Sequence, residues 1–253
     1  MNRKYALGAL TTDEVRAVCG CPPNAILLPV GSVEPHGPHL PLATDTLLSE
    51  EAAERAAEVL GERGVATYVA PSVPYGVTEF AAGFSGAIGV PAATLTALLQ
   101  AIVGRFLADG WSHVCLVNNH LEPAHDAAVR AAIVGLDAGR ASVACPLTRR
   151  WGRTLSDEFK RGNCHAGRYE TSLVLAARSG AHVHEGFASL PDVEMSLSDG
   201  IKEGKTTFVS MGLDRAYTGA PSAASAEEGE ALYGKLTEMI VTEVFEGLAA
   251  KQA

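Results

Sequence analysis

Short apolar runs alternate along the chain with longer stretches in which apolar residues recur at helical spacing. The runs of strand length are 25–30, 65–70, 112–117 and 141–147. Helical spacing, with glycine or proline near several of the ends, marks 15–19, 46–63, 92–108, 123–136, 170–178 and 225–248. The run 25–30 is continuously apolar, which is typical of a strand covered on both faces, and 112–117 is also interpreted as a buried strand.

Strands that take turns with helices in this way predict one α/β domain over residues 1–253, with a mainly parallel sheet between two layers of helices. Pro29 lies inside the first apolar run and indicates an edge strand or a strand end. In parallel sheets of this kind ligands bind beyond the carboxyl ends of the strands. The segments that follow the predicted strands are therefore where functional residues are expected.

Composition narrows the class of protein. Of the 253 residues, 47% are hydrophobic and 19% charged, which is typical of a globular chain. The formal net charge is −9, so no basic stripe is available for nucleic acid. No apolar run approaches the ~20 residues of a membrane span, and the first ten residues lack the apolar core of a secretory signal. We expect a cytoplasmic protein without a nucleic-acid or membrane partner.

Five cysteines occur without a CxxC pair, which argues against a disulfide framework and against a zinc site built on cysteine. Cys164 adjoins a histidine. We interpret it as a bystander thiol rather than a nucleophile, because the local signatures of thiol enzymes do not transfer between families.

The densest group of chemically versatile residues follows the first predicted strand, in a loop rich in proline and glycine. Within twelve positions this loop holds Glu34, His36, His39 and Asp45. A second group follows the 112–117 strand, where His120 and Glu122 have the i, i+2 spacing that puts both side chains on one side of an extended segment. Imidazole and carboxylate groups without cysteine suit Zn²⁺, Mn²⁺ or Fe²⁺.

Five of these side chains, Glu34, His36, Asp45, His120 and Glu122, are candidate metal ligands. They are more than one catalytic ion with an open coordination position needs, and they fit two ions that share the carboxylate of Asp45. We expect His39 to orient the loop rather than to bind metal. A third group, ahead of the helix predicted at 170, contains His165 and Glu170. His165 is suited to general acid catalysis, whereas Glu170 is equally consistent with an acid favoured by the helix dipole.

These groups together resemble the creatininase family of metal-dependent amidohydrolases, and the resemblance spans most of the chain. The family pattern Gly-Ser-x-Glu-x-His-Gly-x-His-Leu-Pro-x-x-Thr-Asp stands here from Gly31 to Asp45. Further matches are Tyr75-Gly76 with Thr78, Phe84-Ser85-Gly86, Asn118-Asn119-His120, His165-Ala166-Gly167, Glu170-Thr171-Ser172 and the stretch from Gly219 to Gly229.

The resemblance implies a creatininase-like three-layer fold with two divalent ions per chain. One ion would be held by Glu34, Asp45 and His120, and the other by His36, Asp45 and Glu122. The implied catalytic residues are His165, Glu122 and Glu170, of which His165 ranks ahead of Glu170 as proton donor to the leaving nitrogen. The implied substrate-binding residues are Thr78, Leu121, Cys164 and His165.

The expected reaction is hydrolysis of a C–N amide bond, in a small-molecule lactam or linear amide, by a water that two ions activate. Creatinine is not the expected substrate, because Leu121 replaces an aromatic residue of creatininase itself. The alternatives within the family are a formamide deformylase and a peptide-trimming hydrolase. A non-catalytic metal-binding protein is a further alternative, as is a phosphoesterase or lactonase if Arg149 or Arg150 faces the ions.

Several remaining residues have simpler interpretations. We expect His113 to be structural, and we give the His182 and His184 pair no role in the site. Trp151 is expected to pack, although its segment is placed where it could overhang the site. The family resemblance also implies a homo-oligomer, with a hexamer as one form.

Overall fold

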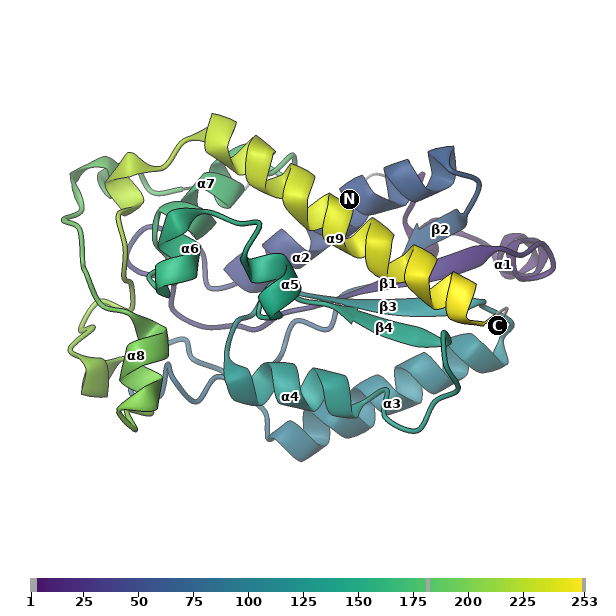
Figure 1. Ribbon diagram of the computed structural model, residues 1–253, viewed down its shortest axis with the longest axis horizontal. Helices are drawn as coiled ribbons and strands as arrows, with labels where there is room; N and C mark the ends of the chain where they lie inside the picture. Colours follow the sequence, from purple (N-terminus) through teal and green to yellow (C-terminus); the bar gives the residue numbers. More distant parts are fainter. Residues whose placement is uncertain (1–3, 181–182, 252–253) are drawn as a thin grey trace.

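A parallel sheet of four strands forms the centre of the computed structural model, which describes residues 4–180 and 183–251 (Figure 1). The strands are β1 (Asn24–Val30), β2 (Ala66–Val69), β3 (His113–Asn118) and β4 (Ala141–Ala144). Their order across the sheet is β2-β1-β3-β4, and every neighbouring pair is parallel. The predicted parallel sheet is therefore confirmed.

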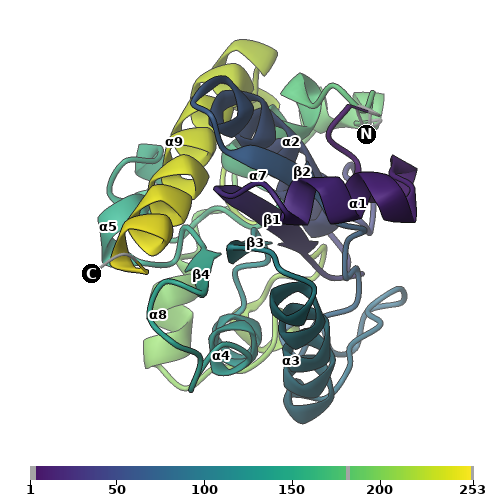
Figure 2. The ribbon, with the colours of Figure 1, turned by 90° about the vertical axis from the view of Figure 1, so that its right-hand side faces the viewer.

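Helices cover both faces of this sheet, as Figure 2 shows. On one side lie α2 (Thr44–Glu62), α7 (Arg168–Ala176) and α9 (Ala226–Ala250), and on the other lie α3 (Ala92–Ala108) and α4 (Pro123–Ala131). The side chains of β1 alternate between the two layers: Ala25 and Leu27 join the core on one face, Ile26 and Leu28 the core on the other. The predicted three-layer α/β/α architecture is confirmed.

Pro29 does not mark an edge, because β1 lies inside the sheet between β2 and β3. The carbonyl of Pro29 accepts the N–H of Val73, on the side of β2. If the residue at position 29 had a backbone N–H, that group would point toward the β2 side as well. The pairing of β1 with β2 has already ended there, because its last residue pair is Leu27 and Val69. The proline therefore removes no ladder bond, and the alternative prediction of a strand end fits its position.

Two predicted elements end early. The helix that begins at Pro123 ends at Ala131 rather than at 136, and the chain then turns through Gly135, whose φ is +87°. The β4 strand ends at Ala144 rather than at 147, because Pro146 lacks the N–H that a longer ladder requires.

Three short α-helices in the described part of the chain were not predicted from the sequence. They are α5 (Arg149–Gly152), α6 (Asp157–Arg161) and α8 (Leu197–Lys202). Each begins after a serine or threonine whose side chain accepts a backbone N–H three residues on, namely Thr148, Ser156 and Ser196. The same device starts α1 (Thr12–Cys19), where Thr11 and Glu14 form a capping box. None of the helices in the described part of the chain is long and apolar enough for a membrane span.

The packing of α9 on α7 generates the first prediction. A Cβ at Gly229 would overlap the backbone of Ser172, whereas a Cβ at Gly234 in the same helix meets nothing within 4 Å. We expect Gly234→Ala to raise the free energy of unfolding by about 0.5–1 kcal/mol, because alanine is the better helix former. Gly229→Ala should lower it. Urea unfolding followed by circular dichroism measures both, and equal stabilisation by the two variants would contradict the close helix contact.

Candidate metal centre and active site

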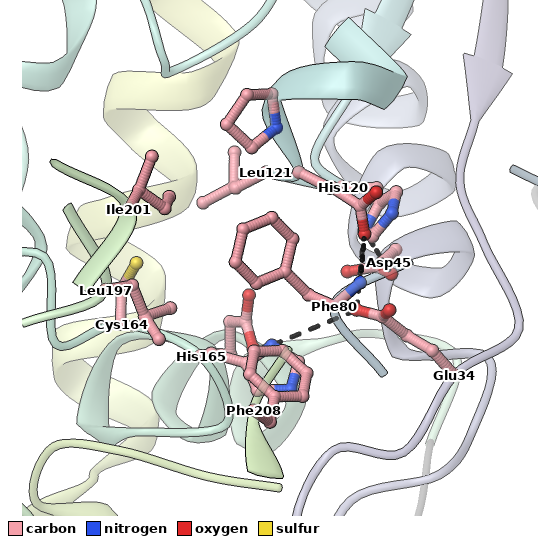
Figure 3. Close-up of a pocket in the computed structure, with 13 residues that line it drawn as sticks. Glu34, Asp45, Phe80, His120, Leu121, Cys164, His165, Leu197, Ile201 and Phe208 are labelled. Carbon is pink, nitrogen blue, oxygen red and sulfur yellow. Dashed lines mark hydrogen bonds and ion pairs between the residues drawn. The ribbon is translucent and has the colours of Figure 1, made fainter. Parts of the chain in front are cut away.

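Acidic and imidazole side chains converge beyond the carboxyl ends of β1 and β3, and Figure 3 shows three of them, Glu34, Asp45 and His120, on one side of a pocket. The loop after β1 and the first turn of α2 supply Glu34, His36 and Asp45, the segment after β3 supplies His120 and Glu122, and the start of α7 brings His165 and Glu170. All seven are at most 7% exposed. The sequence-predicted groups are thus brought together in one dry site.

Asp45 occupies the middle of the group. Its Oδ1 lies 3.2 Å from His36 Nε2, and its Oδ2 lies 3.1 Å from His120 Nδ1. The hydroxyl of Ser32 donates to Oδ2 at 2.6 Å and fixes the plane of the carboxylate. Each oxygen of Asp45 therefore faces a different imidazole, which is the arrangement that a carboxylate shared by two cations requires.

The imidazoles are oriented by backbone carbonyl groups. His36 Nδ1 donates to the carbonyl of Glu34 at 3.0 Å, and His120 Nε2 donates to that of Val77 at 2.6 Å. His165 Nε2 donates to the carbonyl of Pro35 at 3.0 Å. Because a carbonyl oxygen only accepts, the other ring nitrogen of each histidine is left facing the carboxylates. This is how metal-binding histidines are commonly held.

Among the described residues, three sets of possible ligand atoms each lie within 4.8 Å of one another. They are Glu34, His120 and Glu122; His36, Asp45 and Glu170; and Glu34, His36 and His165. The expected partition differs, since it put Glu122 with His36. In the structure Glu122 accepts the N–H groups of Glu79 and Phe80, at 3.1 and 3.2 Å, and stays on the side of His120.

Glu170 instead takes the place beside His36, with its Oε2 3.6 Å from His36 Nε2. The same oxygen accepts the N–H of Ala166 at 2.7 Å. Glu170 belongs to the first turn of α7, where the helix dipole favours a negative charge. The two interpretations of this residue, as a dipole-favoured acid and as part of the site, are thus compatible.

Without a cation the cluster holds more negative charge than it can stabilise. Burial raises the pKa of Glu34 to about 7 and that of Glu170 to about 8. Burial acts against the charged form of His36 as well, yet the carboxylates of Asp45 and its neighbours raise the His36 pKa to about 10. Glu34 Oε2 is buried without a hydrogen-bond partner. Unpaired buried oxygen and crowded carboxylates fit a site for divalent cations.

His165 differs from the other two histidines. Its ring lies between those of His36 and Phe208, with centroid separations of 4.6 and 4.3 Å, and its Nδ1 is 3.9 Å from Glu34 Oε1. Burial, followed by the nearby charge of His36, lowers its pKa well below the usual value. The imidazole is therefore neutral at rest, so it must accept a proton before it can donate one.

Other sequence-predicted residues fall into two groups. Leu121, Cys164 and His165 line the pocket, whereas Thr78 is buried but is not among its lining residues. His39 is hydrogen-bonded through Nε2 to Thr171 Oγ1 at 2.9 Å, which ties the loop after β1 to α7.

Four side chains lie away from the site. Arg150 pairs with Glu246 on α9, so it does not face the carboxylate cluster, and Trp151 donates to Glu243 rather than overhanging the pocket. His113 is buried, bonded to the carbonyl of Gly139 and to Ser142, in the structural role expected of it. His184 caps a short 3₁₀ helix, and His182 lies outside the described residues.

Most of the residues that form the pocket wall were not predicted from the sequence. Its apolar members beyond Leu121 are Phe80, Pro123, Leu197, Ile201 and Phe208. They come from irregular segments and from short helices, so no periodicity marks them. Ser32 was also missed, although its place in the motif that begins at Gly31 was a usable signal.

Comparison with known proteins agrees with this picture. The family model of creatinine amidohydrolase matches residues 8–244. A mycofactocin precursor peptide peptidase of Mycolicibacterium smegmatis is 29% identical over 83% of this chain and 80% of its own length. A creatinine amidohydrolase of Pseudomonas putida is 31% identical over 48% of this chain and 47% of its own.

Solved structures show the same fold. A structure titled as an Mn creatininase has a TM-score of 0.71 at 23% identity, and a variant creatininase of Zn–Zn type has 0.70 at 22%. Each comparison covers 96% of this chain and 98% of the other. These two structures are named for Mn and for Zn–Zn, and they share the overall architecture of this chain.

The pocket thiol generates the second prediction. Burial, with the nearby carboxylates of Glu170 and Glu158, raises the pKa of Cys164 well above its usual value, so the thiol stays protonated. We expect iodoacetamide at neutral pH to alkylate the exposed Cys21 and to spare Cys164 until the protein is unfolded. Peptide mass spectrometry measures both sites. Rapid labelling of Cys164 in the folded protein would instead support a nucleophilic thiol.

Proposed function

Because the chain belongs to the creatininase family, we propose that it is an amidohydrolase that hydrolyses a C–N bond with two divalent cations held by this cluster. The position of Asp45, with one carboxylate oxygen toward each of two oriented imidazoles, is the observation that carries the proposal. The local charge supports the number of cations. When all four are ionised, the buried carboxylates of Glu34, Asp45, Glu122 and Glu170 would carry four negative charges, which two divalent cations would balance.

The proposed ligands follow the geometry of the cluster. Glu34, His120 and Glu122 would hold one cation, and His36 and Glu170 the other, with Asp45 shared between them. Oxygen and imidazole donors suit Zn²⁺, Mn²⁺ or Fe²⁺, and the first two are the metals that the titles of the similar structures print.

The chain's own residues supply positioning and proton transfer. Divalent cations bound to these residues would acidify a water molecule and polarise the scissile carbonyl group. His165 has its Nε2 bound to Pro35, so Nδ1 is the atom that takes up a proton and passes it to the leaving nitrogen. Its contact with the ring of Phe208 holds the imidazole at that position.

Two classes of substrate are consistent with hydrolysis of a C–N amide bond. A small-molecule lactam or linear amide is the first, as in the creatinine amidohydrolase that matches about half of the chain. A peptide is the second, and it is favoured by the full-length relatives, which are named as peptide peptidases. A phosphoesterase or lactonase is disfavoured because neither arginine lines the pocket: Arg150 is bound to Glu246, and Arg149 lines a different hollow. The expected homo-oligomer stays a prediction, which light scattering checks.

Metal content generates the third prediction. We expect protein purified without chelator to contain close to two equivalents of divalent metal per chain, by inductively coupled plasma mass spectrometry. Chelation should abolish release of amine from creatinine-like lactams, linear amides or short peptides, and added Zn²⁺ or Mn²⁺ should restore it. A folded protein with no metal, or a metal-loaded protein that releases amine from none of these classes, would contradict the proposal.

The different positions of Glu170 and His165 generate the fourth prediction. Glu170→Gln should lose about one equivalent of metal, because a neutral amide no longer balances the cation beside His36 and Asp45. His165→Gln should keep both equivalents while turnover falls by about 10²–10⁴. Metal analysis and steady-state rates on the two variants separate these roles. Full metal content in Glu170→Gln would return Glu170 to the role of proton donor.

A further inference from the structure

The pocket beside the cluster has two chemically distinct sides. Carboxylates and imidazoles form its floor, and an apolar wall rises from there. The wall consists of Phe80, Leu121, Pro123, Leu197, Ile201 and Phe208. In Figure 3 the ring of Phe80 stands between the acidic residues on one side and Leu121 and Ile201 on the other. The pocket opens to solvent and has a cavity volume of about 60 Å³, so it accepts a group of small side-chain size.

The wall offers no fixed charge to a substrate. None of the described residues that line the pocket is lysine or arginine. The two lysines near Ile201 are paired with acids of their own segment, Lys202 with Asp199 at 2.8 Å and Lys205 with Glu203 at 3.0 Å. A charged group of a substrate would therefore lose water at this wall without gaining a partner.

The wall is also held in place. The N–H of Phe208 donates to the carbonyl of Phe80 at 2.8 Å, and that of Leu197 donates to Gly162 at 2.8 Å. Behind Phe80 and Phe208 lies a small separate core that contains Ala81, Met211 and Leu213. Because Phe208 also packs on His165, the apolar surface begins directly beside the proposed proton-transfer residue.

We infer that the substrate is an electrically neutral amide that carries an apolar group, of branched aliphatic or aromatic size, next to the scissile bond. The inference rests on the proposed function and adds the chemical class of the substrate. It fits a hydrophobic linear amide, or a peptide with an apolar residue at the cleavage position, better than a compact polar lactam. Each methylene group that the wall buries is worth about fourfold in affinity.

Hydroxamic acids test this without turnover, because their two adjacent oxygens chelate divalent cations. Three hydroxamates that differ only in their tails are compared. Isovaleryl hydroxamate has an apolar branched tail, acetohydroxamate has a methyl group, and succinic monohydroxamate has an anionic tail. On metal-loaded protein, calorimetry should give isovaleryl hydroxamate a Kd at least about tenfold below that of acetohydroxamate. The succinic compound should bind more weakly than either.

A charge placed on the wall gives the matched comparison. Ile201 and Val209 belong to the same stretch of the chain, and their side chains are 37% and 52% exposed. Only Ile201 lines the pocket. Ile201→Lys should reduce the advantage of the isovaleryl tail and strengthen binding of the succinic compound several-fold. Val209→Lys should leave all three Kd values unchanged. Metal analysis of both variants confirms that the cluster is intact.

The outcomes separate the two proposals. Equal affinities for the three tails, or no effect of Ile201→Lys, would overturn the inferred substrate class while leaving the metal-dependent hydrolase in place. Failure of every hydroxamate to bind protein that holds two metal equivalents would overturn the proposed function itself, because the cations would then be closed to ligands.

Discussion

The confinement of four carboxylates in one dry site is the constraint on which the rest of this structure depends. Buried negative charge is costly unless it is compensated, and the protein supplies only part of the compensation. Asp45 and Glu170 both stand in the first turn of a helix, α2 and α7, where the dipole is favourable to an anion. His36 and His120 pull the pKa of Asp45 well below its usual value although burial acts in the opposite direction. The two divalent cations that we propose would supply the remaining compensation.

The fold makes such a concentration of charge tolerable by dividing it among separate elements. Strands β1 and β3 are neighbours with Val30 opposite Asn118, so the segments that follow them leave the sheet side by side. Backbone groups then fix each donor: carbonyls orient His36 and His120, and N–H groups hold Glu122 and Glu170. The proposed ligands are thus already positioned by the protein, which would lower the ordering cost of binding a cation.

The sequence was sufficient to predict that these residues gather in one cluster, because the information is local. A proline- and glycine-rich loop after a buried strand holds Glu34, His36 and Asp45 in one motif, and the parallel sheet brings His120 beside them. The division of the carboxylates was not predictable in the same way. Whether Glu122 or Glu170 lies beside His36 depends on where α7 packs and on which N–H groups face Glu122, and both are tertiary facts.

The wall of the pocket shows why substrate is harder to predict than reaction class. Its residues come from the segment around Phe80 and from the stretch that includes Leu197, Ile201 and Phe208, where no strand or long helix imposes a pattern. Such segments tolerate change as long as the small core behind them stays filled. The floor, in contrast, is constrained by charge balance and by backbone hydrogen bonds. If the floor sets the chemistry and the wall selects the molecule, as we propose, one family can include proteins named for creatinine and proteins named for a peptide.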